Sequence, residues 1–264
     1  MQLTILSEKL DSLTMDDFIH EFRVIHATET RTMAKTLGII TKYIQGVRLP
    51  NKDPLLHLPI PEADPFVHSF AQLSWPSVTV LQGALSTEGY RKSAGSHVFA
   101  IPLKVYVTEK LHPGTEEEIQ SPDSIRVVVG LSPLSTSSFP QKWSEHAAFC
   151  RSICDRYQRH QIIPLDAPKI EQIFGHTQFT PNAVVTSGGY EDFVFGTRTE
   201  AQAFFDQHGS AIRDSYDRFV DPKSSFCYAF DNVLQYSPSD RGFIETVVGF
   251  FIGIALRLKV LFNC

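Results

Sequence analysis

The chain has 264 residues, which is enough for two domains of ordinary size. Its composition, 42% hydrophobic and 20% charged with 20 phenylalanines, is typical of a globular protein with aromatic-rich cores or an apolar pocket. The net charge of −5 argues against nucleic acid as a partner. Four cysteines without a disulfide pattern, and no secretory signal at the start, favour free thiols in a reducing, cytoplasmic setting.

The first half predicts alternating strands and helices in the order β-α-β-β-α-β. Thr14, followed by two aspartates, is a helix-capping residue, and Gly38 is the expected end of that helix. The other expected elements are strands at Met1–Leu6, Thr41–Val47, Val78–Leu85 and Lys104–Glu109, and a weaker helix at Thr87–Phe99. The stretch Asn51–Pro65 predicts a long loop, of the kind that often forms a lid or a site wall.

The second half predicts the same order of elements. Thr197 begins a second capping box, which opens a helix to about Arg218. The other expected elements are a helix at Phe139–Tyr157 and strands at Ser124–Leu131, Gln158–Leu165, Tyr190–Phe195 and Ser225–Asp231. This order is that of a ferredoxin-like unit, and it occurs twice.

Aromatic and proline landmarks support an internal duplication. Phe18, Phe22, Tyr43, Phe99 and Pro102 recur 114 to 121 residues later as Phe139, Trp143, Tyr157, Phe219 and Pro222. In such a unit both helices cover one face of the sheet, so the other face must be buried elsewhere. We therefore predict an α+β fold in which two units pack sheet to sheet as a fused barrel around an apolar pocket. The expected divisions are 1–111 and 124–237 for the units, 112–123 for a linker and 238–264 for a tail.

The tail contains an apolar segment, Gly242–Phe262, that belongs to neither unit. Its longest charge-free stretch, Thr246–Leu256, is too short for a membrane span. We expect a hydrophobic helix that packs on the barrel or pairs with a second copy of the chain. Association with a membrane surface and a tail without order are the alternatives.

Four further segments form a recognisable pattern: Asp17–Ala27 (DFIHEFRVIHA), Leu37–Gln45 (LGIITKYIQ), Gly189–Phe195 (GYEDFVF) and Asp217–Pro222 (DRFVDP). Together they resemble the EthD family of the dimeric α+β barrel superfamily. The resemblance implies a tandem, fused copy that is similar to fungal tailoring enzymes of aromatic polyketide pathways, such as dehydratases and decarboxylases. Related barrels include isomerases and cofactor-free monooxygenases.

Three histidines are the candidate catalytic residues. His26 shares a helix face with Phe18 and can exchange protons near neutral pH without a cofactor. His97 and His146 are the candidate acid partners of His26. In the second copy the position equivalent to His26 is Ala147, and His146 lies one residue before it. Each of the three can equally be a structural or surface histidine.

Aromatic residues on or beside the predicted strands are the candidate substrate contacts, because a tyrosine can stack on an aromatic ring and donate to a phenolate oxygen. They are Tyr43, Trp75, Tyr106, Tyr157 and Tyr228. We expect no metal and no cofactor, since His146, Cys150 and Cys154 lack an obvious fourth ligand and no phosphate-binding or dinucleotide motif is present.

These observations predict a cofactor-independent acid–base enzyme, a lyase or isomerase, that acts on an aromatic or polyketide small molecule of secondary metabolism. A cofactor-free monooxygenase acting on an anthrone-like substrate is one alternative. A non-catalytic protein that binds a small molecule or an assembly partner is the other.

Overall fold

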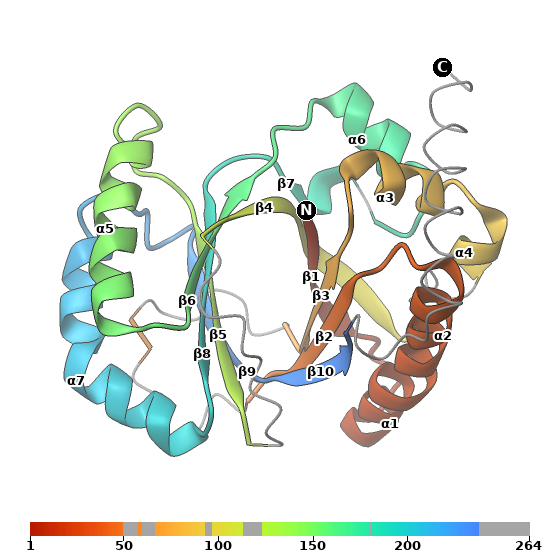
Figure 1. The fold of residues 1–264 in the computed structure, drawn as a ribbon, viewed down its shortest axis with the longest axis horizontal. Helices are drawn as coiled ribbons and strands as arrows, with labels where there is room; N and C mark the ends of the chain where they lie inside the picture. Colours follow the sequence, from red (N-terminus) through yellow and green to blue (C-terminus); the bar gives the residue numbers. More distant parts are fainter. Residues whose placement is uncertain (50–57, 60–66, 93–96, 113–122, 180, 238–264) are drawn as a thin grey trace.

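The structure is a computed structural model that describes residues 1–49, 58–59, 67–92, 97–112, 123–179 and 181–237. Ten strands form one continuous sheet in the order β10-β2-β3-β1-β4-β6-β8-β5-β9, with β7 paired to β4. Helices lie on two opposite outer sides of these strands, α1 to α4 on one side and α5 and α7 on the other (Figure 1).

The first unit supplies four strands and its own helical layer. Its strands are β1 (Gln2–Lys9), β2 (Lys42–Val47), β3 (Ser69–Ser74) and β4 (Ala100–His112). Its helices are α1 (Met15–His20), the π-helix η1 (Glu21–His26), α2 (Ala27–Leu37), α3 (Val78–Leu85) and α4 (Glu88–Lys92). The first three of these helices follow one another directly, so they form a single helical segment between β1 and β2.

The second unit repeats this plan with a longer connection between its middle strands. Its strands are β5 (Ile125–Leu131), β6 (Tyr157–Ile162), β7 (Val184–Val185), β8 (Gly189–Phe195), β9 (Phe226–Asp231) and β10 (Val233–Tyr236). Its helices are α5 (Phe139–Ile153), α6 (Ala167–Phe174), the 3-10 turn η2 (Pro181–Ala183) and α7 (Arg198–Tyr216).

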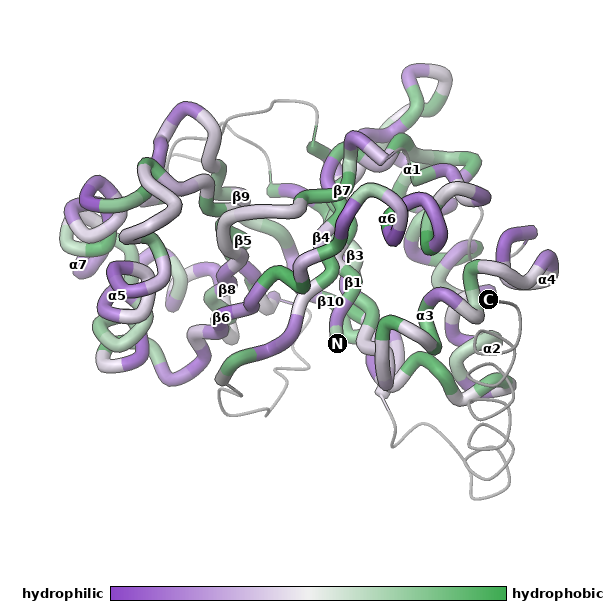
Figure 2. The backbone as a smooth tube through the Cα atoms, turned by 90° about the horizontal axis from the view of Figure 1, so that it is seen from above, coloured by the Kyte–Doolittle hydropathy of each residue, from purple (hydrophilic) through white to green (hydrophobic). Residues whose placement is uncertain are grey.

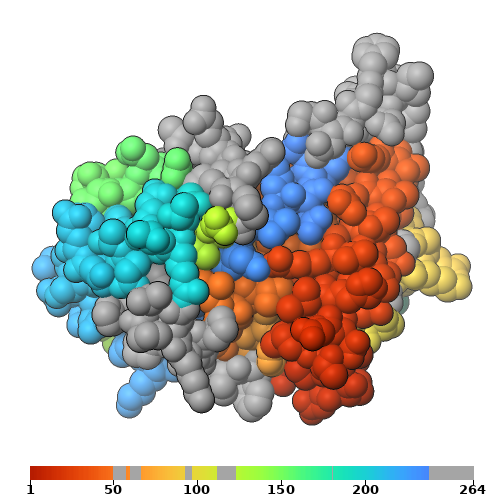
Figure 3. Space-filling model, turned by 90° about the horizontal axis from the view of Figure 1, so that it is seen from below, coloured from red at the N-terminus to blue at the C-terminus, as the bar shows by residue number. Residues whose placement is uncertain are grey.

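The predicted fold class is confirmed by the strand order. The first unit reads β2-β3-β1-β4 along the sheet and the second reads β6-β8-β5-β9, which is the same ferredoxin-like order. The units join where β4 pairs with β6, and again where Arg48, after β2, bridges Phe230 of β9. These two seams close the strands into a barrel within one chain. From below, the two units lie side by side with β9 and β10 between them (Figure 3).

Helix ends follow the expected local chemistry. The hydroxyl of Thr14 accepts a hydrogen bond from the backbone N–H of Asp17 at the start of α1. Gly38 ends α2 with a φ of 64°, a left-handed conformation that glycine adopts without the clash of a Cβ. Thr197 caps α7 in the same way as Thr14 caps α1, by accepting from the N–H of Glu200. The two capping predictions are therefore confirmed.

The expected strand at Val78–Leu85 is wrong, because this segment is helix α3. Ser77 caps it by accepting from the N–H of Val80, and every residue from Val80 to Leu85 is buried. The third strand of the unit is instead Ser69–Ser74, buried between β1 and β2. The weaker helix expected at Thr87–Phe99 is realised as the short α4. Besides the strand at Ser69–Ser74, the sequence does not predict α6, η2, β7 or β10.

Three apolar layers hold the barrel together. Each unit has a core between its helices and the outer face of its strands, and a third core fills the space between the two units. The third core is aromatic, with Phe70 against Phe230 and Tyr106 against Tyr190 at centroid distances of 5.5 and 5.3 Å. Strands group in the middle between two helical layers, in which hydrophobic and hydrophilic stretches alternate (Figure 2).

The predicted linker, 112–123, lies outside the described residues except at its two ends, and the apolar segment 242–262 with its expected helix lies wholly outside them. Across the described ranges, no helix is long and apolar enough to cross a membrane.

Candidate active site

The fold distributes the predicted site residues over three places. His26, His97, Tyr43 and Trp75 lie on the helix-covered side of the first unit, and the first two come together although 71 positions separate them in the chain. Tyr106 and Tyr228 lie inside the barrel. His146 and Tyr157 lie between the helices and the strands of the second unit.

A buried carboxylate is the centre of the second unit's helix-covered side. Glu191 is fully buried on β8, and its oxygens accept hydrogen bonds from the indole N–H of Trp143 and from the hydroxyls of Tyr157, at 2.5 Å, and Tyr216, at 2.7 Å. Burial alone would raise the pKa of Glu191, but the neighbouring His146 and the hydrogen bonds from His146, Tyr157 and Tyr216 hold it below its ordinary value. The carboxylate is therefore ionised at neutral pH.

His146 connects this carboxylate to the surface. It lies on α5 with its Nε2 atom 3.4 Å from Oε2 of Glu191 and its Nδ1 atom 2.9 Å from Oγ of Ser215 on α7. The ring packs on Tyr216 at a centroid distance of 4.2 Å, which fixes its orientation. Serine, histidine and glutamate thus form a continuous polar chain, which is the arrangement by which a buried carboxylate orients a histidine for proton transfer.

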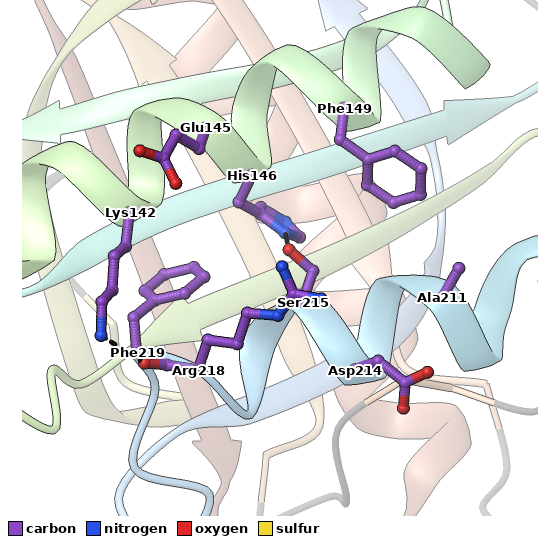
Figure 4. Close-up of a pocket in the computed structure, with 9 residues that line it drawn as sticks. All are labelled: Lys142, Glu145, His146, Phe149, Ala211, Asp214, Ser215, Arg218 and Phe219. Carbon is purple, nitrogen blue, oxygen red and sulfur yellow. Dashed lines mark hydrogen bonds between the residues drawn. The ribbon is translucent and has the colours of Figure 1, made fainter.

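A pocket of about 450 Å³ opens between α5 and α7, directly over His146 and Ser215. His146 and Ser215 lie at its centre, joined by their hydrogen bond, and the aromatic rings of Phe149 and Phe219 form part of the wall (Figure 4). The remaining lining residues are Lys142, Glu145, Ala211, Asp214 and Arg218. The pocket is therefore part apolar and part charged, and its size is in the range of small-molecule sites.

The predicted Tyr157, and Cys150, contact this polar chain without lining the pocket. Tyr157 is 1% exposed and donates its hydroxyl to Glu191, and burial together with that carboxylate raises its pKa well above the ordinary value. Cys150 lies 3.2 Å from Nε2 of His146, and burial, with Glu191 next, raises the pKa of its thiol. Both groups stay protonated at neutral pH and act through their contacts.

The histidines of the first unit form a different cluster. The rings of His26 and His97 are 5.1 Å apart between centroids, and both pack on Phe99. Burial, with a smaller effect of His97, lowers the pKa of His26 to about 3. His26 is therefore neutral at physiological pH and a weak base, which disfavours the role first assigned to it.

Strand register explains why the two histidines differ. Tyr43 lies opposite Leu73, as Tyr157 lies opposite Phe193, so the two units can be aligned residue by residue. Two positions before these partners, the first unit has Ala71 where the second has Glu191. The two histidines pack on equivalent phenylalanines, Phe99 and Phe219. The first unit therefore keeps a helix histidine at this place but lacks the carboxylate.

Sequence reasoning missed Glu191, Ser215 and Tyr216. The signal for Glu191 is present in the segment GYEDFVF, because two acidic residues inside an otherwise apolar strand must be buried and paired. Ser215 carries no such signal, because its hydrogen bond to His146 links two helices that are far apart in sequence. Within the described part of the chain, no group of three or more His, Cys, Asp or Glu side chains could hold a metal ion.

Fold and site together define a single-chain α+β barrel with a histidine–carboxylate pair beneath a surface pocket. No family model matches the chain, so the EthD resemblance depends on the quoted segments. A 108-residue stretch is 31% identical to the "Chalcone isomerase cfoK" of Aspergillus candidus. That stretch is 39% of this chain and 39% of the relative, so the match spans well under half of either protein.

Two solved structures also align with most of the chain. One is a proposed monooxygenase from Lactobacillus acidophilus NCFM, with a TM-score of 0.46 and 7% identity over 89% of this chain and 96% of that one. The other is a proposed monooxygenase from Fusobacterium nucleatum, with a TM-score of 0.47 and 8% identity over 88% and 91%. Superpositions at this level do not bear on activity.

Proposed function

We propose that this chain is an acid–base enzyme, an isomerase or lyase, that acts on a phenolic small molecule in the pocket between α5 and α7. The observation that carries the proposal is His146, which is held between the pocket hydroxyl of Ser215 and the ionised Glu191. Nε2 of His146 lies 3.4 Å from the carboxylate of Glu191.

The chemistry needs one proton to leave the substrate and one to return. His146 accepts the proton of a phenolic hydroxyl, either directly or through Ser215, and Glu191 stabilises the imidazolium that forms. In an isomerase reaction the phenolate then adds to a conjugated carbon–carbon double bond in the same molecule, and His146 returns the proton to the carbon next to the carbonyl. In a lyase reaction the phenolate instead expels a leaving group, and His146 returns the proton to that group. No electron acceptor is required, because the step is redox-neutral.

Four observations support a phenolic or otherwise acidic aromatic substrate. Phe149 and Phe219 offer ring surfaces, and Lys142 and Arg218 can attract a phenolate or carboxylate. The partial match to a chalcone isomerase points to hydroxylated enones, and the EthD resemblance points to aromatic polyketides of secondary metabolism. We therefore assign a hydroxylated aryl enone, or a related polyketide phenol, as the substrate class.

The test is turnover of 2′-hydroxychalcone by the purified chain, followed by absorbance and by chromatography of the ring-closed product. In D₂O the product should gain one deuterium on the carbon next to the carbonyl. His146→Gln should lower kcat by at least tenfold, whereas the matched variant His26→Gln should retain activity.

Three results would reject the proposal. Oxygen uptake during turnover would favour the cofactor-free monooxygenase instead. Saturable binding of every aryl enone tested without product would favour a carrier. Loss of turnover in His26→Gln with full activity in His146→Gln would move the site to the first unit.

A further inference from the structure

Ser215, His146 and Glu191 have the connectivity of a nucleophile, a base and a group that orients the base. Ser215 lies in the last turn of α7, and its Oγ atom is 2.9 Å from Nδ1 of His146. The other ring nitrogen, Nε2, is 3.4 Å from Oε2 of the ionised Glu191. A serine hydroxyl within hydrogen-bond reach of a base, with the base held by a third group, is the geometry of an activated nucleophile.

The three residues lie at increasing depth below the surface. Ser215 is half-buried and lines the pocket between α5 and α7, whereas His146 is 2% exposed and Glu191 is fully buried. In Figure 4 the hydroxyl of Ser215 points from α7 toward the ring of His146 at the centre of the pocket. A substrate in the pocket therefore meets the hydroxyl first, while the carboxylate behind it is kept away from water.

Neighbouring contacts hold these residues in one arrangement. Tyr216 follows Ser215 in the chain, donates its hydroxyl to Oε2 of Glu191 at 2.7 Å and packs on the ring of His146 at a centroid distance of 4.2 Å. A single turn of α7 therefore supplies the hydroxyl and also supports both groups behind it. Because little rearrangement is needed before reaction, such a fixed geometry favours catalysis.

The first unit lacks this arrangement. Ala71 occupies the register position of Glu191, and Nδ1 of His26 makes no hydrogen bond among the described residues. The same fold therefore forms without a serine–histidine–carboxylate chain. Since the second unit brings these three residues together beneath a pocket, a catalytic role accounts for them better than a structural one.

Arg218 places a positive charge beside the serine hydroxyl. Its side chain extends across the pocket toward Ser215 and His146 (Figure 4). Within the described part of the chain its guanidinium forms no ion pair, although Glu145 and Asp214 line the same pocket. A cation next to an attacked carbonyl group stabilises the negative charge that develops on the carbonyl oxygen.

We propose that this pocket also hydrolyses aryl esters, with Ser215 as the nucleophile. Oγ of Ser215 bonds to the ester carbonyl carbon while its proton passes to Nδ1 of His146. The bond from that carbon to the aryl oxygen then breaks, and the phenol leaves with the proton from His146. In the second step water bonds to the acyl carbon and gives a proton to His146. The bond to Oγ breaks, Oγ takes that proton, and the carboxylic acid is released.

The test is hydrolysis of p-nitrophenyl acetate by the purified full chain, followed by the absorbance of p-nitrophenolate. Ser215→Ala should lower the rate at least tenfold, whereas the matched control Ser210→Ala, at an exposed position of α7, should not change it. Arg218→Gln should lower kcat more than it raises KM, because it acts on the charge of the transition state. A fluorophosphonate, whose phosphorus bonds to an activated serine with loss of fluoride, should label Ser215 as located by peptide mass mapping.

Three outcomes would overturn the proposal. They are the absence of the fluorophosphonate label from Ser215, an unchanged rate in Ser215→Ala, and an unchanged rate in His146→Gln. The labelling uses the unmodified chain, so it decides the question even if a variant fails to fold. Ester hydrolysis is measured without an enone, so the esterase and isomerase proposals can each fail while the other stands.

Discussion

Replacing Glu191 by glutamine tests the buried network most directly. The carboxylate accepts hydrogen bonds from Trp143, Tyr157 and Tyr216 and faces His146, and hydrogen bonds to a charged group contribute about 1.5–3 kcal/mol each. The amide oxygen of glutamine keeps some of these bonds, but it carries no charge and its NH₂ group faces donors. Changing three such hydrogen bonds from a charged to a neutral acceptor, at about 1–1.5 kcal/mol each, should cost about 3–4 kcal/mol.

Urea unfolding at neutral pH measures this change, with thermal melting as a second readout. A loss of that size should lower Tm by roughly 6–16 °C, at about 2–4 °C per kcal/mol for a chain of this size class. The matched control is Glu145→Gln on the same pocket, whose carboxylate is exposed and should change stability by less than about 0.5 kcal/mol. A cost below about 1 kcal/mol for Glu191→Gln would show that the carboxylate is not held by this network.

The same variant changes the acid response of the protein. Because folding lowers the pKa of Glu191, its contribution is present above the ordinary pKa of about 4.3 and is lost as the pH falls through the lower folded value. Unfolding free energies of Glu191→Gln should therefore fall less steeply below about pH 4 than those of the unmodified chain. Parallel curves would refute an ionised Glu191 in the folded state.

Four further substitutions test other parts of the fold by urea unfolding. Folding lowers the pKa of His26 to about 3, so this histidine takes up a proton at about pH 6.5 only in the unfolded chain. The free energy of unfolding should therefore fall by about 2 kcal/mol between pH 7.5 and 5 on account of His26. His26→Gln should remove this loss, and an unchanged pH slope in the variant would contradict a buried, neutral His26. Thr197→Ala should cost about 1 kcal/mol by uncapping α7, with Thr197→Ser as the conservative control; equal losses would exclude the cap. Gly46→Ala would place a Cβ 2.5 Å from the carbonyl oxygen of Asp231 at the seam between β2 and β9 and should cost about 1–3 kcal/mol. Gly89→Ala meets no atom within 4 Å and should stabilise α4 by about 0.5–1 kcal/mol; a reversed order of these two glycine variants would count against the barrel seam.

Local chemistry made much of the fold predictable. Thr14 and Thr197 are read correctly as caps because a cap depends on residues only three positions apart. The segment Val78–Leu85 predicts a strand, wrongly, because its β-branched residues favour a strand when viewed alone. Its helix depends on the Ser77 cap and on burial of every residue from Val80 to Leu85, and burial is a property of the assembled chain.

The site was predictable only in part, for a related reason. His146 could be named from the repeat, but its partners come from β8 and α7, and no local pattern brings them to α5. Strand alternation does imply that Glu191 and Asp192 point to opposite faces of β8. It does not say which face meets a histidine, and in the structure both faces do, because His146 lies on one side and His160 on the other.

Differences between the two units show that the Glu191 network depends on a set of coordinated residues. The second unit has Trp143 where the repeat places Phe22, so an indole N–H is present only where a carboxylate exists to accept it. Both units have a tyrosine at the equivalent strand position, but the two hydroxyls make different hydrogen bonds. The hydroxyl of Tyr157 donates to Glu191, whereas the hydroxyl of Tyr43 accepts from the side-chain amide of Gln45.

A carboxylate introduced at Ala71 would therefore meet neither the indole donor nor a free tyrosine hydroxyl. An unpaired buried charge is more costly than an apolar side chain. A first unit with a carboxylate at position 71 would therefore be stable only if the indole and tyrosine donors of the second unit were introduced with it. It follows that acid–base function at this place requires several residues together, and a histidine such as His26 cannot acquire it by a single substitution nearby.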